Sequence, residues 1–179
     1  MVMHANGGDE PGLIDVDFND FYSRGYRRCI TLGYVLTGSA ADADDLVQEA
    51  FSTGYRRWSE ISGYDDPLGW IRKVMVNNAM SRTRRLRREV LAMARFGNRP
   101  PAVSPAIDER DRELWLLVSK LPKQQAAAIA LHYVDDLTLD SIAEVLGCSA
   151  GTVKTHLSRG RHALASRLTA PTKEAMHDD

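Results

Sequence analysis

Apolar residues recur every three to four positions along almost the whole chain, and this spacing constrains the fold more than any other feature. The first series comprises Phe18, Phe21, Tyr22, Cys29, Leu32 and Leu36. Residues at these intervals share one face of an α-helix, which they can bury against other helices. No segment shows the strict alternation of apolar and polar residues that is typical of a half-buried strand. The sequence therefore predicts an all-α fold.

Start signals predict three helices between residues 16 and 95. Ser39 can cap the second helix, which we expect to run to Trp58. Asp66 can cap the third helix, with Pro67 at the first helical position, where its missing amide hydrogen costs nothing. The expected inner faces of these two helices contain Ala43, Leu46, Val47, Ala50, Phe51, Leu68, Ile71, Val74 and Met75.

The helical spacing is lost over residues 96–107, where prolines and polar residues predict an extended linker. We therefore expect two small helical domains, at residues 16–95 and 108–170, with disordered tails at residues 1–15 and 171–179. The expected apolar stripe of the first helix in the second domain consists of Leu114, Leu117, Val118 and Leu121.

The last two helices carry the signals of a helix-turn-helix. Thr138 and Ser149 can each cap a helix, and Gly147 can end the first helix with a positive φ. The small Ala143 permits a close crossing, and Val153 supplies an apolar anchor in the second helix.

The outer face of the last helix predicts contact with the major groove of DNA, where Lys and Arg read guanine and hydroxyls make shorter contacts. We expect these contacts from Ser149, Thr152, Lys154, Thr155, Ser158, Arg159 and Arg161. The alternative is a structural helical hairpin with a solvated face. His156 and His162 have no Cys or acid beside them at ligand spacing, so we interpret them as surface or phosphate-contacting residues rather than metal ligands.

A second basic helix is predicted between residues 67 and 88, which hold seven Lys and Arg residues and no acid although the whole chain has a net charge of −1. Such a helix can neutralise phosphates, and aromatic side chains can stack on unpaired bases. The predicted contacts with an opened DNA strand are Trp70, Lys73, Asn77, Ser81, Arg84, Arg85 and Arg88. The alternatives are a core position for Trp70 and a solvated face for the charges.

The helix that starts after Ser39 has the opposite character. Asp45, Gln48, Glu49 and Ser52 share one outward stripe, opposite its apolar residues. An acidic stripe suits a basic protein partner better than DNA.

Three segments of the sequence resemble those of a known family. Residues 42–51, Asp-Ala-Asp-Asp-Leu-Val-Gln-Glu-Ala-Phe, look like the core-polymerase-binding segment of the sigma-70 family. Residues 67–88 resemble the adjoining segment that melts and reads the −10 promoter element, and residues 121–168 resemble the region that reads the −35 element. The order and spacing are similar to those of the compact extracytoplasmic-function group, which keeps only these two domains.

The resemblance implies a sigma factor that binds RNA polymerase core, directs promoter-specific initiation and needs no cofactor. It implies contacts with the largest polymerase subunits through an acidic helix whose residues are Asp44, Asp45, Leu46, Gln48, Glu49 and Phe51. Leu46 and Phe51 would support that helix from inside. Ser81 stands where many members have Asp, and Thr83 interrupts the arginine run, so the −10 preference cannot be copied from other members. The usual additional partner of the group is an anti-sigma factor.

Two other classes of function fit the sequence less well. A helix-turn-helix regulator that does not act as a polymerase subunit is the main alternative, but the N-terminal half lacks the alternating strands of a receiver domain. An enzyme would need converging carboxylates, a metal set or a phosphate loop, and we find none in the sequence. Cys29 and Cys148 are too few for a disulfide scaffold, and no apolar run is long enough to cross a membrane, so we expect a cytoplasmic protein without membrane insertion.

Overall fold

The computed structural model describes residues 12–92 and 109–168, and within these ranges it contains helices and no strands. The helices are α1 (Gly12–Thr37), α2 (Ala40–Arg56), α3 (Trp58–Ile61), α4 (Pro67–Ala92), α5 (Glu109–Ser119), α6 (Lys123–Tyr133), α7 (Leu139–Leu146) and α8 (Ala150–Leu168). The predicted all-α fold is confirmed. The predicted linker, residues 96–107, and the predicted C-terminal tail, residues 171–179, lie outside the described residues. The same is true of residues 1–11 of the predicted N-terminal tail, but residues 12–15 belong to α1, so the prediction of a disordered tail up to residue 15 is wrong there. None of the described helices is long and apolar enough to span a membrane.

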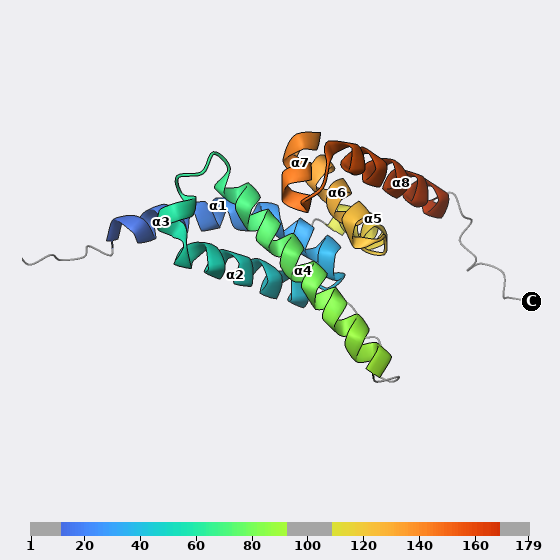
Figure 1. Cartoon of the computed structure of the whole chain (residues 1–179), viewed down its shortest axis with the longest axis horizontal. Helices are drawn as coiled ribbons and strands as arrows, with labels where there is room; N and C mark the ends of the chain where they lie inside the picture. Colours follow the sequence, from blue (N-terminus) through green and yellow to red (C-terminus); the bar gives the residue numbers. More distant parts are fainter. Residues whose placement is uncertain (1–11, 93–108, 169–179) are drawn as a thin grey trace, which may run out of the picture.

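Helices α1 to α4 form the first unit, in which α1 packs along α2 and α4 contacts both (Figure 1). The Ser39 hydroxyl accepts a hydrogen bond from the Asp42 amide at 3.4 Å, which confirms the predicted cap of α2. At the start of α4, the Asp66 carboxylate accepts from the Gly69 amide at 2.8 Å, and Pro67 is the first helical residue as predicted.

The second helix is shorter than the sequence predicted. It ends at Arg56, and the Arg57 amide donates to the Gly54 carbonyl in a tighter turn before α3 begins at Trp58. This turn lets the Trp58 ring enter an aromatic cluster, where its centroid lies 5.2 Å from that of Phe18. Trp58 is buried in this cluster.

Helices α5 to α8 form the second unit, with α6 at its centre against α5, α7 and α8. The predicted stripe of α5 needs one correction, because Leu114 is exposed and Trp115 is buried. The buried side is centred on Trp115, Val118 and Ser119, which lie three and four positions apart, so Leu114 falls at its edge.

The two units pack against each other, an arrangement that the sequence did not predict. Helix α1 contacts α5 and α6, and α4 contacts α7 (Figure 1). Residues 29, 30 and 32–36 of α1 are all buried, so this part of the helix is covered on every side. One layer of helices cannot do this, and α5 and α6 supply the second layer.

Candidate nucleic-acid interface

The helix-turn-helix has the local geometry that the sequence predicted. Thr138 accepts from the Ser141 amide at 3.2 Å, and Ser149 accepts from the Thr152 amide at 3.1 Å, so both caps are confirmed. Gly147 has a φ of 65°, in the left-handed region, and its amide donates to the carbonyl of Ala143. Helix α7 therefore begins and ends on defined residues and α8 begins on one, and this fixes the direction of α8 relative to α7.

The apolar side of α8 packs on α6, and this sets which residues point outward. Val153, Leu157 and Leu164 are buried, and Gly160 is so close to α6 that a Cβ there would lie 2.6 Å from the Ile129 side chain. The predicted DNA contacts Ser149, Lys154, Thr155, Ser158, Arg159 and Arg161 are exposed, and Thr152 is half-buried. The described helix α8 contains no acidic residue, so its outer face is cationic.

The two histidines of α8 have different surroundings. Among the described residues, no group of three His, Cys, Asp or Glu could hold a metal ion. His156 is half-buried, and burial together with the charge of Arg159 holds its pKa below the usual value. His162 is exposed.

Helix α4 carries the second basic surface, but its cations do not all face solvent. Lys73, Asn77, Ser81, Arg84 and Arg85 are exposed, and the side chain of Arg88 lies outside the described residues. Arg72 is only 2% exposed and donates two hydrogen bonds to the carboxylate of Asp135, at 2.8 and 3.1 Å. Arg72 is therefore not available to phosphate in this arrangement, and it lies on the same side of α4 as Leu68 and Met75.

The aromatic residues at the start of α4 border a cavity. Trp70 is half-buried, with the guanidinium of Arg57 5.2 Å from its ring centroid. Tyr64 donates to the Glu60 carboxylate at 2.7 Å, and this bond together with those from Arg57 lowers the pKa of Glu60. Neither aromatic side chain is sealed in the core, so both remain candidates for stacking on bases.

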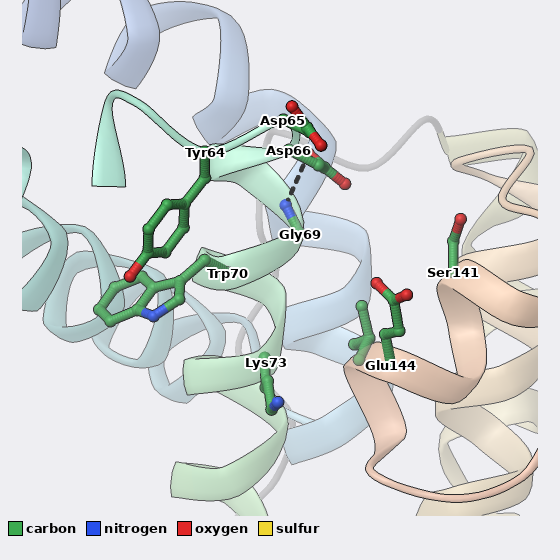
Figure 2. Close-up of a pocket in the computed structure, with 9 residues that line it drawn as sticks. Tyr64, Asp65, Asp66, Gly69, Trp70, Lys73, Ser141 and Glu144 are labelled. Atoms are coloured by element: carbon green, nitrogen blue, oxygen red, sulfur yellow. Dashed lines mark hydrogen bonds between the residues drawn. The ribbon is translucent and has the colours of Figure 1, made fainter. Parts of the chain in front are cut away.

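The cavity, of about 320 Å³, lies between α4 and α7, and Figure 2 shows its walls. Trp70 and Lys73 lie on the α4 side, and Ser141, Glu144 and Val145 lie on the α7 side. The predicted −10 surface and the helix-turn-helix thus share a boundary.

The acidic surface of α2 faces away from the second unit. Asp45, Gln48 and Glu49 are exposed, whereas Leu46 and Phe51 are buried beneath them. Helix α2 contacts α1, α3 and α4 and has no extensive contact with α5 to α8.

Two acids of this surface have partners within the first unit. Asp44 is half-buried and accepts a hydrogen bond from the Tyr26 hydroxyl at 2.5 Å. Burial and this bond raise the pKa of Tyr26. Glu49 forms an ion pair with Arg82 of α4. Asp45 is therefore the acid of the predicted polymerase-binding group that is most available to a protein partner.

An apolar component of this surface was missed by the sequence reasoning. Tyr55 is half exposed and lines a cavity of about 580 Å³ with Phe18, Tyr22 and Gln48. Tyr55 lies one turn after Phe51 and two turns after Gln48, so it lies at the border of the apolar and polar sides of α2. That spacing could have identified it.

Comparisons with known proteins agree with this geometry. Residues 21–89 match the family described as Sigma-70 region 2, and residues 111–164 match Sigma-70, region 4. The ECF RNA polymerase sigma factor SigW of Bacillus subtilis is 27% identical, over 93% of this chain and 94% of that protein. The RNA polymerase sigma-E factor of Streptomyces coelicolor is 30% identical, over 78% of this chain and 79% of that protein.

Solved structures share the fold at lower identity. The sigma factor RpoE in complex with the anti-sigma factor NepR, from Bartonella quintana, is 22% identical with a TM-score of 0.74, over 87% of this chain and 99% of that chain. CnrH in complex with the cytosolic domain of CnrY is 20% identical with a TM-score of 0.62, over 88% of this chain and 91% of that chain. Taken with the two matched regions and the relatives above, these findings show that the chain belongs to the extracytoplasmic-function group of the sigma-70 family of RNA polymerase sigma factors.

Proposed function

We propose that this chain binds RNA polymerase core through α2 and directs it to promoters that α8 and α4 recognise. The observation that carries the proposal is the separation of charge: the outer side of α2 is acidic, whereas α8 has exposed cations and no acid. Opposite charge on two separate surfaces supports two different partners, a basic protein surface and DNA.

Polymerase docking is assigned to the exposed part of α2. Asp45, Gln48 and Glu49 would contact the largest polymerase subunits, and Asp44 would orient the surface through its bond to Tyr26. Leu46 and Phe51 would keep the helix in position from the core side.

Promoter recognition is assigned to the two basic helices. We propose that α8 enters the major groove of the −35 element, with Lys154 and Arg159 on base edges and the other exposed residues on phosphates. We propose that α4 captures the opened −10 strand, with Asn77 on a base and Trp70 as a stacking surface. Residues 16–95 and 108–170 would act as the two promoter-binding domains and residues 96–107 as their linker.

The setting of this activity follows from the same proposal. Transcription initiation takes place in the cytoplasm, so we expect the chain to act there. Binding energy in the assembled holoenzyme would drive strand opening, so the chain itself would catalyse no reaction and require no cofactor. Because the similar RpoE was solved with the anti-sigma factor NepR, we propose that a protein of that kind also controls this chain.

The decisive experiment is in vitro transcription with core polymerase from the same host on a library of genomic templates. We expect discrete new start sites that share one −10 and one −35 sequence. Asp45→Lys should abolish them, whereas Asp140→Lys, the same change at an exposed acid of α7, should not. Sequence-specific DNA binding without any new start site would instead identify a helix-turn-helix regulator that does not serve polymerase.

A further inference from the structure

A buried ion pair joins the two units. Arg72 of α4 and Asp135, in the turn between α6 and α7, each have side chains that are 2% exposed. The guanidinium donates from Nε to Oδ2 at 3.1 Å and from Nη2 to Oδ1 at 2.8 Å. A two-bond arrangement of this kind fixes direction as well as distance, so it specifies one orientation of the units. We call it the interdomain ion pair.

Further charges surround the interdomain ion pair. Arg28 of α1 lies 3.7 Å from Asp135, and Asp66 at the start of α4 lies 3.9 Å from Arg72. Arg28 and Asp66 are more than half exposed, so they contribute less than the buried pair. If the units separated, water would hydrate both Arg72 and Asp135. Each of the two charges therefore requires its partner only in the closed state.

On its buried side, the interdomain ion pair has an apolar neighbour. The Cys29 thiol is buried beside it, and burial raises the pKa of this thiol to about 12. The neighbouring part of α1 is covered by α5 and α6. A charge left without its partner at such a place is costly, which makes closure sensitive to either member of the pair.

Closure affects the three proposed binding surfaces differently. Helix α7 lies against the first half of α4, so Glu144 stands across the cavity from Lys73 and Trp70 (Figure 2). A carboxylate at this position repels phosphate, and α7 limits the approach of a strand to the indole. The outer faces of α2 and α8 stay exposed in the same arrangement.

We propose that the closed arrangement is an autoinhibited state of the free protein, that the interdomain ion pair holds it closed, and that the start of α4, at Trp70 and Lys73, can take a DNA strand only after the pair breaks. This inference rests on the proposed function of α4. Docking through α2 and duplex contact through α8 are possible in both states, so polymerase and promoter can bind first and opening can follow.

The expected size of the effect follows from the cost of an unpaired buried charge. Removing one partner shifts the ratio of open to closed molecules toward open by about 100-fold or more. Because apparent affinity is reduced by the fraction of open molecules, binding of a strand to α4 should tighten by up to about the same factor.

The test compares Asp135→Asn with Asp136→Asn. Asp136 is exposed and has a φ of 51°, a conformation that Asn tolerates, so it controls for the same chemical change one residue away. We expect small-angle X-ray scattering of the free protein to give a larger radius of gyration for Asp135→Asn and an unchanged value for Asp136→Asn. Arg72→Met, which changes the partner residue in the other unit, should give the same expansion. It provides a second test in case Asp135→Asn does not fold. Far-UV circular dichroism should show unchanged helix content in all three variants.

Strand access is measured with a fluorescent single-stranded DNA oligonucleotide of random sequence. All variants are compared in a background of Lys154→Ala and Arg159→Ala, which lowers the contribution of α8 to the same extent in each of them. Asp135→Asn should bind this probe more tightly, and Asp136→Asn should bind it as the background protein does. Expansion without tighter binding would overturn the inhibitory role, and absence of expansion in both folded variants would overturn the role of the ion pair. The scattering measurement needs no polymerase, so its result is independent of whether the transcription experiment succeeds.

Discussion

Helices α4 and α8 look alike in sequence, since both are rich in Arg and Lys, but the structure uses their cations differently. In α8 the buried side is made of Val153, Leu157 and Leu164, so its cations lie on the outside. In α4 Arg72 lies on the buried side and is bonded to Asp135. The number of cations on a helix therefore does not give the number available to phosphate, because their position relative to the buried side decides it.

The two helices also differ in their surroundings. Helix α8 presents its polar side to solvent along most of its length, whereas α4 has α7 beside its first half and Glu49 paired with Arg82 in its second half. Under the proposed function, the site for duplex DNA is open in the free protein, and the site for a strand that appears only after melting is partly covered. The difference matches the order in which the two partners become available.

The strongest test of the comparison is the stability of arginine variants. Arg72→Ala should lower the free energy of unfolding by about 3 to 5 kcal/mol, because it leaves Asp135 buried without its main partner. Arg159→Ala should change it by less than about 0.5 kcal/mol, because Arg159 is exposed. Urea unfolding followed by circular dichroism measures both. Similar small losses at the two positions would show that the buried pair is unimportant for closure and folding.

The second test is specificity of DNA binding by α8. Lys154→Ala and Arg159→Ala should each cost about 1 to 3 kcal/mol on the preferred −35 sequence and much less on scrambled DNA, if they contact bases. Fluorescence anisotropy on the two duplexes gives the difference. An equal loss on both duplexes would make them phosphate contacts, each of which changes the log-log salt slope by about 0.9.

A smaller effect is expected at the cap of α8. Ser149→Ala should cost about 1 kcal/mol of stability, because it leaves the Thr152 amide without its acceptor. Ser149→Asp, which retains a capping oxygen, is the matched control. If thermal unfolding is unaffected by the alanine but binding to the −35 duplex weakens selectively, Ser149 acts on DNA rather than as a cap.

The smallest effect concerns His156. Its pKa is lowered by burial and by Arg159, so the unfolded chain takes up a proton at a higher pH than the folded chain. Stability from this residue should be fully present above about pH 6.5 and should decline as the pH falls below that value. NMR titration should place the pKa of His156 below the ordinary value for histidine, about 6.5. A higher pKa for His156 would contradict its burial.

Local features of the fold could be predicted from the sequence. The caps at Ser39, Asp66 and Ser149 depend on residues three positions away, so the chemistry that makes them is visible in a short window. The interdomain ion pair joins residues 63 positions apart, and no local pattern reports such a distance. One signal was present, because Arg72 follows Leu68 by four positions and precedes Met75 by three, which places it on the buried side.

The candidate surfaces show the same division. Exposure of Asp45, Lys154 and Arg159 follows from helical spacing alone, and the structure places all three on the outside. The half-burial of Asp44 against Tyr26 depends on how α1 and α2 pack, which spacing does not specify. The roles of these residues in binding remain predictions for the experiments above.

The complete burial of α1 over most of residues 29–36 affects how the chain can be divided. A fragment containing only α1 to α4 would leave bare the side that α5 and α6 cover, and a bare apolar strip of this kind promotes self-association. Truncated chains made to assign one activity to each half would then associate through the exposed α1 surface, and the measured activities would be those of oligomers. Point substitutions on the outer surfaces of the intact chain, such as Asp45→Lys on α2 and Arg159→Ala on α8, separate the contributions of the halves without creating that surface.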